Sequence, residues 1–340
     1  MKWTISILFS FILGGTFLLE SCRKNEHHST TPLVFTIPPG FPATKQNVNL
    51  LSEEAFLLGR KLFHDGRLSK DGNFPCSSCH QQLAAFTTFE HDRSHGYNNS
   101  HTQRNAPALF NLAWYPLFNQ DGSASTLDEI SLAHITAPDE MGETIAGVLA
   151  KLKDDAEYQE MFRKAYGTTT ISSERIMNAL SQYLLNLVSA DSKYDRVKKG
   201  QEAFTAEEQS GYVVFQAKCA SCHTEPLFTD FSFRNTGLPI DNLLKDYGRF
   251  RVTGNSSDSM KFRVASLRNL NFSSYYAHDG RYSFPRMMVQ HYRDGVQPGT
   301  TVDPLVAGGI PLTTLEENNL VYFLRTLSDS SFIKNPKYME

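Results

Sequence analysis

The sequence predicts a mainly α-helical protein, built as two similar halves with extensive irregular loops and little β structure. Amphipathic helical periodicity recurs along the 340-residue chain, whereas strand-like alternation is sparse. Two segments share a plan, because each combines an amphipathic helix, a Cys-x-x-Cys-His motif, a long irregular stretch and a further helix. The length is sufficient for two domains of ordinary size.

The first half is predicted to be helical on both sides of its cysteine motif. Ser52 is a good N-cap for the first helix, because it precedes an amphipathic run that includes Phe56 and Leu62. Further helices are expected over residues 143–153, 155–166 and 172–189. The apolar stripe of the last helix reads as core and consists of Ile176, Leu180, Tyr183, Leu184 and Leu187.

The second half is predicted to open with the capping box Thr205-Ala-Glu-Glu208, which starts a helix leading into Cys219. A last helix is expected to start at Thr314 and to bury Leu320, Phe323, Leu324 and Leu327. The polar stretch 190–203 reads as the connection between the halves. We therefore predict an N-terminal domain over residues 48–195 and a C-terminal domain over 196–335.

Two copies of Cys-x-x-Cys-His carry the strongest chemical signal, CSSCH at Cys76–His80 and CASCH at Cys219–His223. In this pattern each of the two thiols forms a thioether with one haem vinyl group, and the histidine ligates the iron. Zinc ribbons place their second cysteine pair about 15–20 residues on, and a thioredoxin-like pair needs no adjacent histidine. The motifs predict two covalent haem c groups, in two cytochrome c-like domains, attached through Cys76, Cys79, His80, Cys219, Cys222 and His223.

Composition and the N-terminus indicate an exported protein. The net charge of −3 gives no basis for nucleic-acid binding. Residues 1–21 read as a signal peptide that ends in Leu-Glu-Ser-Cys, which resembles a bacterial lipobox with Cys22 as the lipidated residue. Of the five cysteines only Cys22 lies outside the haem motifs, so no disulfide is expected. Residues 22–47 are expected to tether the protein to a membrane in the periplasm; an ordinary secreted protein with a spare cysteine is the alternative.

Several further motifs occur in a characteristic order along the chain. They are LGRKLFHDGRLS (Leu58–Ser69), RNAP (Arg104–Pro107), PDEMG (Pro138–Gly142), DYGRF (Asp246–Phe250), SLRN (Ser266–Asn269) and HDGR (His278–Arg281). Together with the haem motifs, they resemble the bacterial di-haem cytochrome c peroxidases and the related MauG-type enzymes, from about Leu50 to Leu327. This resemblance implies that the haem held by His80 is peroxidatic and that the haem held by His223 transfers electrons.

The resemblance also implies residues for the chemistry of each haem. Glu140 occupies the place of the family's distal carboxylate, which moves a proton between the two peroxide oxygens. The alternative is a surface acid at a helix N-terminus. Tyr292 falls where the second haem has its sixth ligand, which is tyrosine in MauG-type enzymes and methionine in other members. The rival ligands nearby are Met287, Met288 and His291.

Other residues are predicted to complete the haem pockets. By resemblance, a histidine after the first motif can close the peroxidatic iron; His95 is the best match, with His91 and His101 as alternatives. His278 is expected near the second haem. Guanidinium groups pair bidentately with carboxylates, so three arginines are candidate anchors for haem propionates. They are Arg104, Arg249 and Arg268. The resemblance also implies a calcium ion between the domains, held by Asn105 with backbone carbonyls of Ser273 and Tyr275.

The chain departs from the family pattern at two places. The family sequence FWDGR is replaced by Phe118-Asn-Gln-Asp-Gly-Ser123, so the tryptophan between the haems is absent. Trp114 lies close in sequence but does not align with it. Ile130 stands where the family has a distal glutamine.

The sequence thus predicts an exported peroxidase that reduces hydrogen peroxide with electrons from a small cytochrome c or cupredoxin. A homodimer is left open. MauG-like oxidation of a protein or organic substrate is the first alternative. A di-haem electron carrier without turnover is the second, and it would result if His95 never left the first iron.

Overall fold

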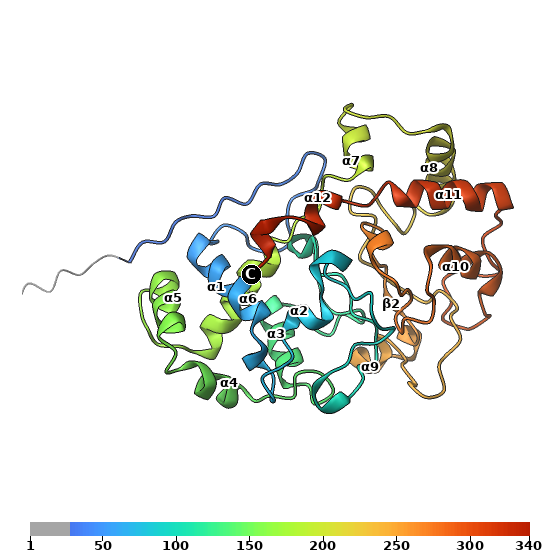
Figure 1. Ribbon diagram of the computed structural model, residues 1–340. Helices are drawn as coiled ribbons and strands as arrows, with labels where there is room; N and C mark the ends of the chain where they lie inside the picture. The colour runs from blue at the N-terminus through green and yellow to red at the C-terminus, as the bar shows by residue number, and fades with distance from the viewer. Residues whose placement is uncertain (1–27) are drawn as a thin grey trace, which may run out of the picture.

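A computed structural model describes residues 28–340 (Figure 1). The expected signal peptide and Cys22 lie outside the described residues. Residues 28–47 differ from the predicted tether, because they pack along the first lobe. Leu33 N–H donates to Leu51 O over 2.9 Å, and Lys45 N–H donates to Ala113 O over 2.9 Å. Within residues 28–340, no helix has the length and apolar character needed to cross a membrane.

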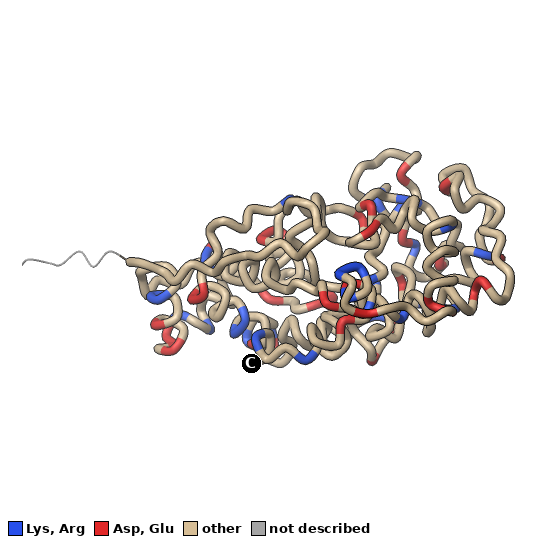
Figure 2. Tube along the Cα trace, turned by 90° about the horizontal axis from the view of Figure 1, so that it is seen from above, with Lys and Arg blue, Asp and Glu red and all other residues tan. Residues whose placement is uncertain are grey.

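The predicted fold class is confirmed. Helices and irregular loops make up two lobes that lie side by side, and the strands of the described residues form one two-stranded sheet (Figure 1). Its antiparallel strands are β1 (Phe233–Arg234) and β2 (Phe262–Arg263), with Phe233 opposite Arg263. Basic and acidic residues are mixed over both lobes, as the nearly balanced charge suggests (Figure 2).

The first lobe is built on the packing of two helices. Its elements are α1 (Glu53–His64), α2 (Cys76–Cys79), α3 (Leu127–Thr136), α4 (Ile145–Leu152), α5 (Ala156–Tyr166) and α6 (Ser173–Leu185). Ser52 caps α1 as predicted, accepting from Ala55 N–H. A side chain at Gly59 of α1 would place its Cβ 1.9 Å from Ala179 O of α6, so glycine permits this close packing.

Two features of this lobe differ from the prediction. Helix α6 ends at Leu185 rather than near 189. Helix α3 was not predicted, although it starts with a capping box between Thr126 and Glu129. Its apolar positions are few, since only Leu127 and Ile135 are buried, so periodicity gave little signal.

The second lobe repeats this construction. Its elements are α8 (Ala206–Lys218), α9 (Phe250–Thr253), α10 (Pro285–Gln290) and α11 (Thr314–Arg325). The capping box between Thr205 and Glu208 is confirmed. A Cβ at Gly211 of α8 would lie 1.9 Å from Asn319 O of α11. Helix α11 begins at Thr314 as predicted, and a capping box between Thr313 and Glu316 closes its first turn.

The two lobes are joined twice. The predicted connection contains helix α7 (Lys193–Lys198), which begins with a capping box between Ser192 and Asp195. The polar sequence of this stretch had been interpreted as a linker. After α11 the chain returns to the first lobe through α12 (Ser330–Ile333), and its C-terminus lies beside α1 and α6 (Figure 1). Phe332 and Tyr338 belong to the first core. The predicted C-terminal domain therefore includes a segment that packs with the other lobe.

Candidate haem sites

The first haem motif lies on α2, with His80 directly after the helix. The Nδ1 atom of His80 is 3.0 Å from Phe86 O, which a left-handed turn at Ala85 and Phe86 brings under the ring. A ring whose Nδ1–H donates to a carbonyl leaves Nε2 free as an acceptor for a metal. Burial lowers the pKa of His80 to about 4, which favours the neutral imidazole that metal ligation requires.

The second motif reproduces this arrangement. Cys219 follows α8, and Nδ1 of His223 lies 3.2 Å from Phe228 O and 3.1 Å from Ala265 O. Its Nε2 is therefore also the free nitrogen. Two motifs more than a hundred residues apart thus present histidine in one tautomer and one orientation, as axial ligation of haem iron requires.

A cavity of about 350 Å³ lies over the second motif. Cys219, Cys222 and His223 line one side of it, and Met288 and Tyr292 also belong to its lining. His291 does not, because its Nε2 atom is 2.9 Å from Thr236 O. Among the rival ligands for the second iron, the structure therefore brings Tyr292 and Met288 to the cavity.

A π-helical turn, η7 (His291–Gly295), continues α10 and carries Tyr292. Such turns are rare and occur frequently at functional sites. The segment is held from both sides. Ile310 N–H donates to Tyr292 O over 2.7 Å. The buried carboxylate of Glu317 on α11 accepts from Arg286 over 2.8 Å and also from Arg293.

The same cavity contains buried polar atoms that fit a cofactor with polar substituents. His278 Nδ1 and Gln120 Oε1 are buried, line the cavity and have no hydrogen-bond partner within residues 28–340. The His278 ring stacks on Phe262 with 4.0 Å between ring centroids. Buried polar atoms are seldom left unpaired. The His278 ring can donate through Nδ1–H, so it suits the carboxylate-bearing edge of a haem, whereas Gln120 Oε1 needs a hydrogen-bond donor. His278 thus lies near the second haem site, as predicted.

Glu140 lies in the turn between α3 and α4. Tyr97 N–H donates to Glu140 O over 2.5 Å, and the Ser100 hydroxyl donates to Asp139 O over 3.0 Å. Gly96 permits this contact, because a Cβ there would lie 2.2 Å from Asp139 O. Helix α4 begins only at Ile145, so the alternative placement of Glu140 at a helix N-terminus is wrong.

The charge of Glu140 acts on the first haem motif. Burial raises the pKa of Cys76 to about 12, with smaller contributions from Cys79 and from the Glu140 carboxylate. Burial also raises the pKa of Cys79, and Glu140 again adds to the shift. Burial lowers the pKa of His80, and the charge of Glu140 acts in the opposite direction. The contacts place it there as well, because Tyr97 N–H donates to Glu140 O and His95 of the same loop lies beside the Cys79 sulfur. The fold therefore brings Glu140 near CSSCH, although about sixty residues separate them in sequence.

The partner of Glu140 is a residue that sequence reasoning missed. The side chain of His134, in the last turn of α3, contacts the Glu140 carboxylate through Nδ1. A separation of six residues across a helix end has no periodic signature, so the sequence offered no signal for this pair. Ile130, one turn earlier on α3, packs against the first core instead.

The histidines predicted to close the first iron lie together near the same motif. The rings of His91 and His95 are 4.3 Å apart between centroids, and those of His95 and His101 are 4.2 Å apart. The loop lies beside Cys79, whose sulfur is 3.9 Å from His95 O. The ligand role of His95 stays a prediction.

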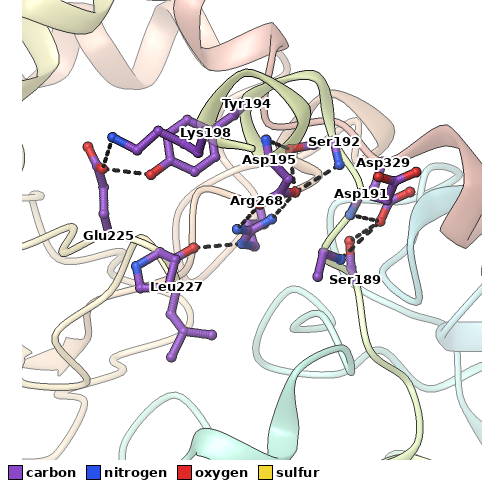
Figure 3. A network of polar contacts seen from close by, with 12 residues as sticks. Ser189, Asp191, Ser192, Tyr194, Asp195, Lys198, Glu225, Leu227, Arg268 and Asp329 are labelled. Atoms are coloured by element: carbon purple, nitrogen blue, oxygen red, sulfur yellow. Dashed lines mark hydrogen bonds and ion pairs between the residues drawn. The ribbon is translucent and has the colours of Figure 1, made fainter. Parts of the chain in front are cut away.

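The three candidate propionate anchors contact protein groups. Arg104 binds Asp246 over 2.6 and 2.9 Å and Asp121 over 2.6 Å. Arg249 donates to the backbone carbonyl of Asp121 over 2.9 Å. Arg268 donates to Asp195 over 2.7 and 2.9 Å (Figure 3). These contacts favour a role in holding loops together, and propionate binding stays a prediction.

The remaining predictions concern the region between the lobes. Asn105, Ser273 and Tyr275 all belong to the lining of the cavity, and their role as calcium ligands stays a prediction. Trp114 does not line it, because its indole N–H donates to Pro42 O over 2.8 Å. The adjacent Tyr115 does line the cavity, under the guanidinium of Arg263.

Comparisons with known proteins identify the family of this chain. Residues 53–203 match the sequence profile of the family described as di-haem cytochrome c peroxidase. The chain is 33% identical over 331 residues to the methylamine utilization protein MauG of Methylorubrum extorquens, covering 93% of this chain and 92% of that protein. It is 33% identical over 227 residues to the cytochrome c551 peroxidase of Nitrosomonas europaea, covering 66% of this chain and 68% of that protein.

A solved structure shows the same architecture. The crystal structure of a MauG-like protein associated with microbial copper homeostasis superposes with a TM-score of 0.82 and 30% sequence identity. The match covers 90% of this chain and 98% of that one. The similarity therefore extends over both lobes.

Proposed function

Because this chain belongs to the di-haem cytochrome c peroxidase and MauG family and carries two haem c groups, we propose that it reduces hydrogen peroxide to water with electrons from a small redox protein. The donor is of the cytochrome c or cupredoxin type. The observation that carries this proposal is the position of Glu140 near the first haem motif, where its backbone is bound by the loop that also contacts Cys79. Peroxide reduction requires a group that moves a proton from one peroxide oxygen to the other.

The two sites divide the work. When bound at His80 and His223, haem supplies the redox-active irons for peroxide and for electrons. Glu140 accepts the proton from the inner peroxide oxygen and returns it to the outer oxygen, which leaves as water. Phe86 O and Phe228 O hold the two proximal histidines in the ligating tautomer. Tyr292 and its π-helical turn shape the distal side of the second site.

Export belongs to the same proposal. We place the mature protein in the periplasm, anchored to a membrane through lipidated Cys22, with His95 as the reversible ligand of the first iron. A calcium ion at Asn105 and association into a homodimer complete the proposal.

Stoichiometry of peroxide and donor tests the function. We expect the fully haem-loaded protein to oxidise two molecules of reduced cytochrome c for each peroxide consumed, because peroxide needs two electrons to yield two waters. Stopped-flow absorbance of the donor measures this ratio. The alternative predicts consumption of peroxide with oxidation of an added protein or organic substrate while the donor stays reduced. Absence of both reactions would identify an electron carrier.

MauG-like oxidation is the second candidate, and Tyr292 is the observation that favours it. A phenolate ligand stabilises ferric and higher iron, which suits an enzyme that shares oxidising equivalents between two irons. The side chain lines the cavity that also contains His223.

The variant Tyr292→Phe tests the ligand. We expect the ferric protein to lose the Raman bands of an iron-bound tyrosinate, and the reduction potential of the second iron to rise, because phenylalanine keeps the ring and removes only the oxygen. Met288→Leu, at a neighbouring position of the same cavity, is the control and should keep the bands. If both variants give the wild-type Raman spectrum, Tyr292 is not a ligand.

A further inference from the structure

The hydrogen-bonded pair of His134 and Glu140 has two ends of different character. The Nδ1 atom of His134 contacts Glu140 Oε2, and within residues 28–340 its Nε2 atom makes no hydrogen bond. The side chain of His134 is 39% exposed and that of Glu140 is 29% exposed. An imidazole that is bonded through one nitrogen and open at the other can take up a proton at one end and release one at the other.

Electrostatics distinguish the inner member of the pair from the outer one. The Glu140 carboxylate acts on Cys76, Cys79 and His80, whereas the charge of His134 acts on His80 and on neither cysteine. The contacts agree: Tyr97 N–H donates to Glu140 O, and His95 O of the same loop lies 3.9 Å from the Cys79 sulfur, so Glu140 is the member of the pair attached to the loop beside the haem motif.

We propose that His134 relays protons between the solution and Glu140, and this proposal rests on the peroxidase function proposed above. Each peroxide that becomes two waters takes up two electrons from the donor protein and two protons from solution. For each proton, His134 accepts H⁺ at Nε2 and donates the Nδ1 proton to the Glu140 carboxylate, which passes it to the site. The proton that remains on Nε2 then moves to Nδ1 as the ring changes tautomer, which restores the starting state.

The charges around His134 suit this exchange. Burial alone would lower the pKa of His134, but the hydrogen bond and charge of Glu140, with a contribution from Asp139, raise it. His80, at the end of α2, interacts electrostatically with both members of the pair. Helix α6 packs on α3, and the hydroxyl of Ser181 on α6 donates a hydrogen bond to the Asp128 carboxylate of α3. An imidazole with a raised pKa can exchange protons with water near neutral pH.

The variant His134→Asn tests the relay in the holoprotein. An amide donor can still reach Glu140, but it cannot accept a proton and pass it on. We expect the first-turnover reaction with peroxide to stay within about twofold of wild type, and steady-state turnover with excess donor to fall about tenfold or more. The hindered base 2,6-dimethylpyridine, which does not ligate iron, should restore turnover in the variant and have no effect on wild type. Glu143→Gln, whose carboxylate contacts Lys151 and not His134, is the control and should turn over at the wild-type rate.

A second measurement is independent of turnover. NMR of the reduced, carbon monoxide-bound protein follows the histidine ring signals as the pH is changed. The His134 signal is identified by its absence in His134→Asn, and its titration gives the pKa of His134. We expect this pKa to fall in Glu140→Gln, because the carboxylate that raises it is lost.

The outcomes separate this proposal from the proposed function. Wild-type turnover in His134→Asn, or slower turnover that the base does not restore, overturns the relay and leaves Glu140 as the working group. A pKa of His134 that does not change in Glu140→Gln overturns the pair. If Glu140→Gln reacts with peroxide at the wild-type rate, the acid–base role of Glu140 in the proposed function is wrong, whatever the result for His134→Asn.

Discussion

Glu140→Gln is expected to slow the first reaction with peroxide by about 10²–10⁴-fold, the usual contribution of a positioned acid–base group. Glutamine has the same shape and can keep a hydrogen bond to His134, but it cannot accept the peroxide proton. Rapid mixing of the ferric protein with peroxide, followed at the Soret band, measures the rate. Haem content should equal that of wild type, because Glu140 does not contact the proximal histidine through a hydrogen bond within residues 28–340.

Glu143→Gln is the matched control for this variant. Glu143 lies three residues further along, and its carboxylate contacts Lys151 on α4 instead of His134. We expect its rate with peroxide to equal the wild-type rate. A wild-type rate in Glu140→Gln would remove Glu140 from the mechanism. An equal loss in both variants would show that the rate depends on the fold of this turn and not on the Glu140 proton.

The second large effect is expected at the pair that joins helix α7 to the second lobe. The side chain of Arg268 has 0% exposure and that of Asp195 has 6%, and two hydrogen bonds of 2.7 and 2.9 Å connect them (Figure 3). Arg268 also donates to Pro226 O over 2.7 Å. Asp195 in turn accepts from Ser192 as part of the α7 capping box. One carboxylate thus serves both the helix start and the buried guanidinium.

Asp195→Asn should therefore lower the free energy of unfolding by about 3–5 kcal/mol, because it leaves Arg268 buried without its counter-charge. Urea denaturation of the holoprotein measures the loss. The control is Glu160→Gln, which breaks the exposed pair of Glu160 and Arg163 and should change stability by less than about 1 kcal/mol. The double variant Asp195→Leu with Arg268→Met should lose less than Asp195→Asn, since no charge then remains unpaired. A loss in Asp195→Asn as small as that in the control would contradict this account.

The same pair predicts a dependence of stability on pH. Burial alone would raise the pKa of Asp195, but the hydrogen bonds and charge of Arg268 outweigh it and lower the pKa below its usual value. A carboxyl with a lowered folded-state pKa stabilises the fold above its unfolded pKa, which is about 3.9 for aspartate. That contribution is lost as the pH falls through the folded-state pKa. Asp195→Asn should therefore flatten the acid side of the stability curve.

Local signals in the sequence were good guides where one residue acts on its immediate neighbours. Ser52 and the Thr205 capping box were predicted correctly, because a side-chain oxygen that accepts an N–H two or three residues on is a local interaction. Helix α7 was missed because its polar sequence has the composition of a linker, although Ser192 and Asp195 carry the same capping signal.

Long-range contacts were the main source of error. The C-terminal segment was assigned to the second domain from its position in the chain, yet Phe332 packs in the first core. Residues 28–47 were read as a free tether from their composition, yet Phe41 lies against Trp114 with 5.0 Å between ring centroids. Neither contact leaves a periodic pattern in the segment that makes it.

The cofactor chemistry could be predicted from the chain alone, since Cys-x-x-Cys-His carries both thiols and the proximal ligand within one helical turn. The helical fold class could be predicted as well, through caps and apolar periodicity. Three contacts became visible only in the folded chain: Glu140 binds His134, Tyr292 rather than His291 lines the second cavity, and Arg268 pairs with Asp195. The physical reason is that each of these contacts depends on where a turn or a separate helix ends in space, and such positions follow from the packing of the whole chain.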